Sequence, residues 1–264
     1  MTSTRTLATK NDERRFSGVR RLYGEQGLQQ LQAAHIVVIG LGGVGSWTVE
    51  ALARNAVGKL TLIDLDNIAE SNINRQIHAL DENIGKAKVT AMHERITQIN
   101  PACEVVEIED FISAENMAAM LAERPDIIVD CMDDTKAKIA LAAYCHQQHL
   151  PLIVVGSAGG KLDATRIRLI DLAHVHGDRM LAKIRNQLRR DHHFPKASDN
   201  KKSAKFGITA VYSDEPVEKP AQACDTQAGL TGLNCAGYGS SICVTASFGF
   251  IAAQHALQRL VFSH

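Results

Sequence analysis

Four glycines within six residues form the first pattern in this sequence that could bind a ligand. They belong to Gly40-Leu41-Gly42-Gly43-Val44-Gly45, which lies between a short apolar run and a stretch of helical character. Glycines let the backbone turn tightly and approach a phosphate, and the N-terminus of the following helix offers free N–H groups. Asp64 ends the next apolar run, where a carboxylate can accept hydrogen bonds from ribose hydroxyls. Alone, this pattern fits NAD, FAD, S-adenosylmethionine or ATP, and a dinucleotide oxidoreductase is the default.

Polar side chains after Asp64 favour ATP cleavage over hydride transfer. Asn72 and Arg75 come first, Lys88 follows, and Asp133 comes after a later apolar run. A nicotinamide enzyme has no evident use for an amide and two cations beside its phosphate loop. Nucleotidyl transfer does, because the charge that develops on the α-phosphate and pyrophosphate must be neutralised. A carboxylate at the end of a parallel strand, such as Asp133, can also hold Mg²⁺ on the phosphates.

Each of these residues also has a simpler interpretation. Asp64 could merely cap the end of a strand, and Arg75 and Lys88 could be solvated charges on helices. Asp134 is expected to be a helix N-cap. The pair at 192–193 is a loop sequence rather than a metal site, because none of the 11 histidines has ligand spacing.

Apolar runs that alternate with helical stretches predict the elements that must hold these residues. Such alternation is typical of βαβ units and of an α/β fold with a Rossmann-type, mostly parallel sheet flanked by helices. We expect strands at His35–Ile39, Lys59–Asp64, Cys103–Ile108, Ile127–Cys131 and Leu152–Val155. We expect helices at Arg15–Gln32, Val44–Asn55, Gly85–Asn100, Ala114–Glu123 and Thr135–His149.

The pattern changes after Gly156. Further strands are expected at 164–171 and 207–212, with an amphipathic basic helix at 179–190, a polar loop at 192–205 and a helix at 240–260. We therefore expect a flexible tail at 1–14, an ATP-binding Rossmann-type part at 15–156, and a substrate-binding, dimer-supporting part at 157–264 of the same domain.

Composition limits the class of protein and its compartment. The 264 residues are 45% hydrophobic and 22% charged, which is ordinary for a globular protein. None of the six cysteines forms a C-x-x-C pair, so no zinc site is expected. The opening residues lack a secretory signal, and we expect a cytoplasmic protein with free thiols. The stretch 226–258 has no charged side chain, and a membrane anchor is the weaker alternative there to a buried helix.

A basic segment gives the neutral protein a local charge. Between 179 and 205 there are nine Lys or Arg against two acidic residues, although the whole chain has 29 of each sign. A solvated helix face is one interpretation, and binding of a polyanion is the other. The candidate nucleic-acid contacts are Lys183, Arg185, Arg189 and Arg190.

Together, the motifs resemble the ubiquitin-activating-enzyme superfamily, whose small bacterial members adenylate sulfur-carrier proteins. They are Gly-x-Gly-Gly-x-Gly, Asp64, Ser71-Asn72-x-x-Arg75-Gln76, Gly85-x-x-Lys88 and Asp130-Cys131-x-Asp133. The resemblance implies the cofactors ATP and Mg²⁺, with Asp64 on the ribose and Gly40, Gly42, Gly43 and Gly45 around the triphosphate. It implies that Asn72 and Arg75 bind phosphates, that Lys88 stabilises charge at the α-phosphate, and that Asp133 holds Mg²⁺, supported by Asp130.

The same resemblance implies a homodimer in which an arginine from the partner's N-terminal helix completes the site. The expected position falls on Gly18, and Arg15, Arg20 and Arg21 remain open as substitutes. A need for a monovalent cation also remains open.

One branch of the superfamily, the tRNA threonylcarbamoyladenosine dehydratases, is similar over nearly the whole chain. The similarity lies in 156–163, Ile170-Asp171, the basic helix around 181–185, Arg15-Phe16-Ser17 and Leu22-Tyr23-Gly24. It implies ATP-dependent cyclisation of the threonylcarbamoyl group on adenosine 37 of tRNA, and an association with a cysteine desulfurase system.

Two other functions remain open. The first is activation of a ubiquitin-like sulfur carrier, against which the missing C-x-x-C pairs count. The second is a non-catalytic nucleotide-binding partner, for example of a desulfurase. Cys224 and Cys235 are the candidates for a catalytic or sulfur-relay thiol, although a free cysteine is more often a small buried hydrophobe.

Overall fold

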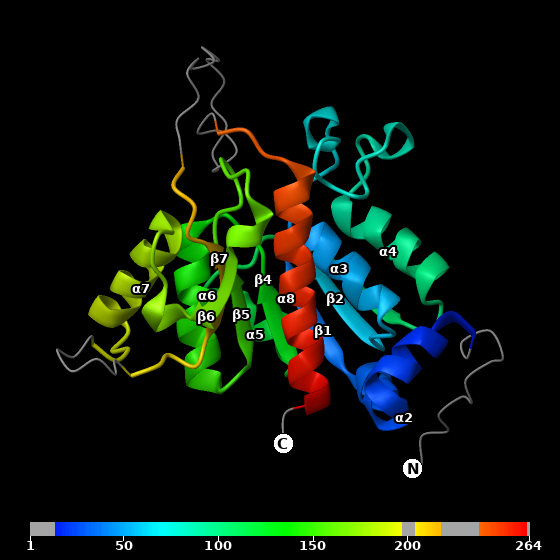
Figure 1. Cartoon of the computed structure of the whole chain (residues 1–264), viewed down its shortest axis with the longest axis horizontal. Helices are drawn as coiled ribbons and strands as arrows, with labels where there is room; N and C mark the ends of the chain where they lie inside the picture. Colours follow the sequence, from blue (N-terminus) through cyan, green and yellow to red (C-terminus); the bar gives the residue numbers. More distant parts are fainter. Residues whose placement is uncertain (1–13, 197–203, 218–237, 263–264) are drawn as a thin grey trace.

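A computed structural model describes residues 14–196, 204–217 and 238–262 (Figure 1). Runs rich in Val, Ile and Leu form one sheet of seven strands, in the order β3-β2-β1-β4-β5-β7-β6. Neighbouring strands are parallel except for β6, which is antiparallel to β7. The strands are β1 His35–Ile39, β2 Lys59–Ile63, β3 Glu104–Ile108, β4 Ile127–Asp130, β5 Leu152–Val155, β6 Ile167–Asp171 and β7 Thr209–Ser213. The predicted mostly parallel α/β sheet is thus confirmed.

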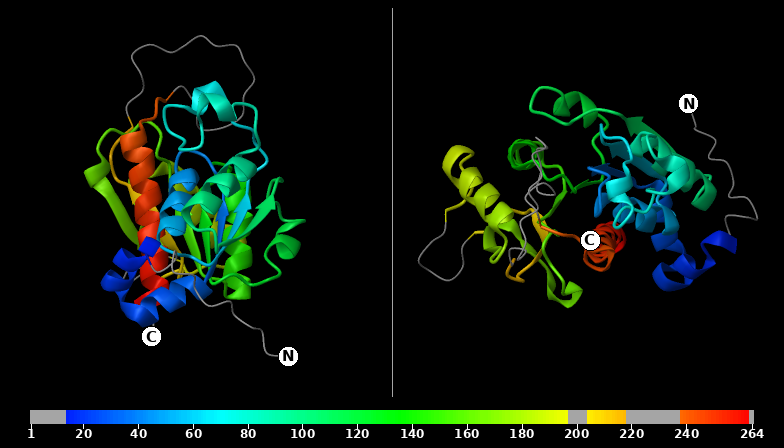
Figure 2. Two further views of the ribbon diagram at one scale, coloured as in Figure 1. Left: turned by 90° about the vertical axis from the view of Figure 1, so that its right-hand side faces the viewer. Right: turned by 90° about the horizontal axis from the view of Figure 1, so that it is seen from above.

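Helices cover both faces of the sheet (Figure 2). One face carries α2 Ser17–Ala33, α3 Gly45–Arg54, α4 Lys88–Ile99 and α8 Ile242–Phe262. The other face carries α5 Met117–Met120, α6 Thr135–Gln148 and α7 Arg179–Asp191. Short 3₁₀ helices lie at Glu70–Asn72, Asp81–Asn83, Ala164–Arg166 and Leu172–His174.

The alternation of side chains along each strand builds two separate cores. In β1, Val37 and Ile39 join the core beneath α5, α6 and α7, whereas Ile36 and Val38 join the core beneath α2, α3, α4 and α8. Successive strand residues point to opposite faces, so a sheet buried on both sides has a continuous apolar sequence. This explains why the strand sequences do not alternate between apolar and polar residues.

The described part of the uncharged C-terminal stretch lies mostly in α8, which is the buried helix that was predicted there. In α8, Gly249 lets the helix approach α3 closely, because a Cβ at this position would lie 2.6 Å from the Val44 carbonyl oxygen. The Thr48 hydroxyl donates to the Gly249 carbonyl across the same contact (3.3 Å). No helix among the described residues is long and apolar enough to cross a membrane.

Several boundaries differ from the prediction for local reasons. The helix expected at 85–100 begins only at Lys88, since Gly85 has a left-handed φ of 86° and the Gly85 N–H binds the Ile68 carbonyl (2.8 Å). The helix expected at 114–123 is shorter than predicted, because α5 covers only Met117–Met120. The strand expected at 164–171 starts at Ile167, because Asp163 caps a 3₁₀ turn before it.

The strand order places the predicted site at a specific crevice. The chain runs outward from β1 in one direction through β2 and β3, and in the other through β4 and β5. Ligands of open α/β sheets bind at the carboxyl ends of strands where the order reverses. That edge meets the segment 64–87, at the top of Figure 1 and of the left view in Figure 2, whereas α2 and the end of α8 lie at the opposite end.

Candidate ATP site

The glycine loop connects β1 to α3 and needs its glycines for steric reasons. Gly40 has a φ of 84°, and a Cβ there would lie 3.0 Å from the Met132 nitrogen of the turn after β4. At Gly45 an added Cβ would lie 1.8 Å from the Gly40 carbonyl oxygen, and at Gly43 it would lie 3.1 Å from Arg75 Cγ. Gly42 is less constrained, with its nearest neighbour at 4.0 Å. The loop is a closely packed cradle, and the Arg75 side chain lies against it at Gly43.

Asp64 ties this loop to the end of β2. Its carboxylate accepts hydrogen bonds from the Leu41 N–H (2.5 Å) and the Asp66 N–H (2.8 Å), and the residue is only 9% exposed. Burial raises the pKa of Asp64, while the Lys88 charge opposes that rise. The strand-end cap considered from the sequence is therefore present, and binding of ribose by the same carboxylate remains a prediction.

Lys88 is brought to the same place by the start of α4. Its ammonium group lies 2.6 Å from Asp66 Oδ2 and 3.8 Å from Asp64 Oδ1, with the residue 5% exposed. Asp66 was not predicted as a site residue. The only signal for it in the sequence is an acid two positions beyond Asp64, at the same sheet edge.

Asn72 and Arg75 lie on the segment that follows. The Asn72 side-chain oxygen Oδ1 accepts from the Ala69 N–H (3.2 Å), which closes the 3₁₀ turn. The Arg75 guanidinium donates to the Ser71 carbonyl (2.6 Å) and to Asn74 Oδ1 (2.8 Å), and partial burial lowers its pKa. The Arg75 backbone is held by the indole N–H of Trp47 in α3 (3.0 Å). Trp47, the single tryptophan of the chain, was not predicted to support the site.

The end of β4 and the turn after it carry three carboxylates. Asp133 is exposed and makes no hydrogen bond or ion pair with the residues the structure describes. Asp134 caps α6 through the N–H groups of Lys136 (2.7 Å) and Ala137 (3.0 Å), as predicted. Asp130 is fully buried and paired with Lys138 (2.9 Å), a residue the sequence analysis missed.

These residues fit a nucleotide and a magnesium ion by their chemistry. Arg75 lies against the glycine cradle at Gly43, and Lys88 lies beside Asp64, whose carboxylate accepts from the Leu41 N–H of the same loop. Among the described residues no group of three or more His, Cys, Asp or Glu could hold a metal. A single exposed carboxylate, Asp133, suits Mg²⁺, which is usually bound by one or two carboxylates with water and substrate phosphates.

The cations of the basic helix α7 are of two kinds: some lie at the surface, and others donate hydrogen bonds to backbone carbonyls of the same chain. Lys183 is exposed, and Arg190 pairs with Asp191 (2.8 Å) at the surface. Arg185 donates to the Val175 carbonyl, and Arg189 donates to the carbonyls of Pro195 (3.1 Å) and Ala173 (3.2 Å). Arg185 and Arg189 thus satisfy carbonyls at the ends of loops, and nucleic-acid contact by all four cations remains a prediction. Lys201 and Lys202 of the segment lie outside the described residues.

The N-terminus of α7 is hydrogen-bonded to the turn after β5. Its cap, Asp178, accepts from the Leu181 N–H (2.9 Å) and also from the Ser157 N–H (2.9 Å). Ser157 lies two residues after the end of β5, so the basic helix is fixed to the turn after that strand. This link depends on a contact between distant residues that composition does not reveal.

Three of the four cysteines that the structure describes are partly or fully buried, and the fourth, Cys243 at the start of α8, is exposed. Burial raises the pKa values of Cys103, Cys131 and Cys145 to about 12. Cys131 lies next to the Asp133 turn but its thiol contacts Thr48. The two candidates from the sequence, Cys224 and Cys235, lie outside the described residues.

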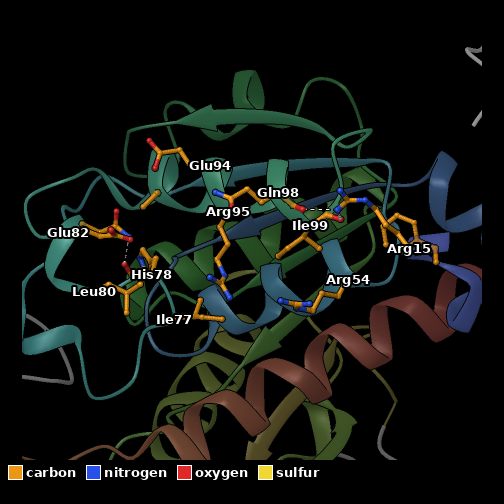
Figure 3. Close-up of a pocket in the computed structure, with 13 residues that line it drawn as sticks. Arg15, Arg54, Ile77, His78, Leu80, Glu82, Glu94, Arg95, Gln98 and Ile99 are labelled. Carbon is orange, nitrogen blue, oxygen red and sulfur yellow. Dashed lines mark hydrogen bonds between the residues drawn. The ribbon is translucent and has the colours of Figure 1, made fainter. Parts of the chain in front are cut away.

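A cavity of about 570 Å³ lies away from the glycine loop, between the start of α2, α3, α4 and the segment 77–83 (Figure 3). The Arg54 and Arg95 side chains point toward one another there, and both bind Glu50 (each 2.6 Å). Arg15 lies at the far end and donates to the carbonyls of Gln98 (2.8 Å) and Ile99 (3.0 Å). Arg15 is therefore engaged within its own chain.

Comparisons with known proteins agree with this geometry. The model of the ThiF family matches residues 16–262. The tRNA threonylcarbamoyladenosine dehydratase of Haemophilus influenzae is 46% identical over 254 residues, covering 95% of each chain. The Escherichia coli protein of that name is 43% identical over 254 residues, covering 94% of this chain and 93% of its own. A crystal structure of the E. coli enzyme in complex with ATP superposes with a TM-score of 0.86 at 41% identity, covering 97% of both chains. The chain therefore belongs to the ThiF family and, within it, to the tRNA threonylcarbamoyladenosine dehydratases.

Proposed function

We propose that this chain uses ATP to adenylate the threonyl carboxylate of N6-threonylcarbamoyladenosine at position 37 of tRNA and closes it to the cyclic form. The observation that carries the proposal is the convergence of Asp64, Arg75 and Lys88 on one glycine cradle at the switch point of the sheet. The named relatives supply the substrate, and the ATP complex of the E. coli relative supports the same nucleotide here.

The first step is attack of a carboxylate oxygen on the α-phosphate, with pyrophosphate leaving. Negative charge builds on the non-bridging oxygens of the α-phosphate, and Lys88 and Arg75 are the cations available beside the cradle. Preorganised charges of this kind stabilise the transition state more than the ground state. Lys88 would exchange its contact with Asp66 for the phosphate, since Asp66 is mostly exposed and easily hydrated.

Asp133 is the residue that would hold Mg²⁺, with Asn72 beside the phosphates. When bound, the ion offsets the negative charge of the triphosphate. Asp64 would accept hydrogen bonds from the ribose while it retains the Leu41 N–H.

The second step is ring closure within the substrate. The carbamoyl group attacks the activated carbonyl carbon, and AMP leaves with the oxygen that was adenylated. The sum of the two steps removes one water from the substrate and needs no cysteine nucleophile. The raised pKa of Cys131, the thiol adjacent to the site, is consistent with that route.

For tRNA, we propose that phosphate contacts come from the surface cations of α7. Lys183 is exposed and Arg190 is 71% exposed at its side chain, so both can reach a polyanion. Arg185 and Arg189 would support these contacts indirectly, by holding the loops around α7.

We also propose a homodimer formed through exposed apolar side chains of α2 and the end of α8. Leu22 is 73% exposed and Phe262 is 62% exposed, and Tyr23 packs on Phe262 (6.2 Å between ring centroids), so α2 and α8 meet here through apolar side chains. Arg15 and Phe16, just before α2, line one end of the cavity of Figure 3. Arg15 binds its own chain and Arg20 binds Glu25 (3.3 Å), which leaves exposed Arg21 as the best candidate to reach a partner's site.

A direct assay tests the function. Incubation with ATP, Mg²⁺ and tRNA bearing the linear threonylcarbamoyl group should give AMP and a tRNA lighter by one water per modified base. The Asp133→Ala variant should give neither. If wild-type protein forms no AMP under these conditions, or if the variant is as active, the proposal fails.

A further inference from the structure

Lys138 of α6 forms a buried ion pair that the reaction described above does not use. Its ammonium group contacts Asp130 Oδ1 (2.9 Å), the Val155 carbonyl (2.9 Å) and the Asp130 carbonyl (3.2 Å). Both side chains of the pair are 0% exposed, and among the ion pairs of the described residues no other has both partners fully buried. All three N–H groups of the lysine are thereby satisfied.

Such a pair is a costly way to fill a core. Removing two charges from water is so unfavourable that apolar side chains of similar volume are often as stable or more stable. Stability alone therefore does not account for a lysine at this position. What the lysine provides instead is a fixed geometry, because its three contacts join the carboxyl ends of β4 and β5.

The pair shapes the turn beside the phosphate cradle. The Asp130 carboxylate accepts a second hydrogen bond from the Met132 N–H (3.0 Å), and Met132 N is an atom against which the cradle packs at Gly40. Asp133 is the next residue along this turn. The other carboxylate oxygen, Asp130 Oδ2, has no partner among the described residues. A chain of contacts thus runs from Lys138 through Asp130 and Met132 to the backbone of Asp133.

We propose that Lys138 is a positioning residue that fixes this turn so that Asp133 presents its carboxylate to the magnesium ion of the bound nucleotide. The proposal rests on the proposed role of Asp133. Lys138 itself touches neither nucleotide nor metal, and it acts through Asp130 by restricting the turn to one conformation. Partners that orient a metal ligand in this way typically contribute 10- to 100-fold to metal affinity or activity.

The test measures binding of a fluorescent ATP analogue over a range of Mg²⁺ concentrations, with no tRNA present. In Lys138→Met, the Mg²⁺ concentration for half-maximal enhancement of binding should rise by about 10- to 100-fold. Binding without Mg²⁺ should change less than about threefold against that scale. Asp133→Ala should show the same pattern, and Lys138→Arg should recover most of the loss. Lys136→Met, an exposed lysine of the same helix, should match wild type.

Wild-type Mg²⁺ dependence in folded Lys138→Met would overturn the proposal, as would equal losses with and without Mg²⁺. If that variant does not fold, Asp130→Asn/Lys138→Met removes both charges, and the same criteria apply to it. The outcome is separable from the fate of the proposed function. A wild-type protein that binds nucleotide with Mg²⁺ but forms no AMP on tRNA would reject that function and leave the role of Lys138 standing.

Discussion

At the scale of single residues, Lys88 is the group on which adenylation depends most. We expect Lys88→Ala to lower the rate of AMP formation by about 10²-fold, as removal of one preorganised charge donor typically does. The matched control is Lys86→Ala, two residues away, where the lysine pairs with Glu94 (2.7 Å) outside the cradle. Single-turnover rates with saturating ATP measure both variants. Comparable losses of rate in the two variants would show that the position of the lysine beside the glycine loop does not matter.

The buried imidazole of His78 leads to a second prediction, about how the free energy of unfolding depends on pH. It is 2% exposed, both ring nitrogens lack a partner among the described residues, and burial lowers its pKa from 6.5 to about 3. As the pH falls from 6.5 towards 3, the unfolded chain binds a proton that the folded chain does not. The free energy of unfolding therefore falls in that window, by up to about 1.4 kcal/mol per pH unit from this group.

Replacement of His78 by Gln removes the titrating imidazole from both the folded and the unfolded chain. Urea unfolding at pH 7.5 and at pH 5 should show a smaller pH-dependent loss of stability in His78→Gln than in wild type. Equal losses in the two proteins would mean that His78 is protonated, or solvated, in the folded state.

At the scale of elements, the contact of α3 with α8 can be tested through one glycine. A Cβ at Gly249 would meet the Val44 carbonyl and Trp47 Cβ (2.9 Å), so Gly249→Ala must separate the helices. Overpacking of this kind typically costs about 1–3 kcal/mol. Gly18→Ala in α2, where an added Cβ meets nothing within 4 Å, should be neutral or stabilising. Thermal unfolding compares them, and equal midpoints for the two variants would contradict the close approach.

The basic helix α7 gives a prediction that separates its two kinds of cation. Replacement of Lys183 or Arg190 by Ala should weaken tRNA binding. Each replacement should also make the plot of log affinity against log salt less steep, by about one unit of slope. Arg185→Ala and Arg189→Ala should mainly lower the melting temperature, because their guanidinium groups satisfy backbone carbonyls. Filter binding at several salt concentrations and thermal melts would measure this. The reverse pattern would show that the engaged arginines are the ones that contact tRNA.

Much of this level of structure could be read from the sequence. The strands β1 and β5 begin and end where their apolar runs begin and end. The loop after β1 is the glycine loop that the motif indicated. Side-chain periodicity could not show which cations of α7 fold back onto carbonyls, because the loops that accept them are 6 to 16 residues away in sequence. Trp47, Asp66 and Lys138 were missed for a similar reason: each acts through a partner whose proximity only the tertiary fold creates.

At the scale of the whole molecule, one sheet brings the two halves of the chain together. The strands after residue 157 add to the same sheet as the cradle, and Asp178 joins the basic helix to the turn after β5. A polyanion bound on α7 would therefore lie near the carboxyl edge where ATP is expected. The division into an ATP-binding part and a substrate-binding, dimer-supporting part remains a prediction.

The central claim is that the threonyl carboxylate attacks the α-phosphate of ATP. The most direct test uses tRNA whose threonylcarbamoyl carboxylate is labelled with oxygen-18, followed by mass spectrometry of the products. The mechanism predicts one labelled oxygen in AMP and none in pyrophosphate, because the adenylated oxygen leaves with AMP when the ring closes. Label in inorganic phosphate or pyrophosphate, or unlabelled AMP alongside the cyclic product, would contradict it.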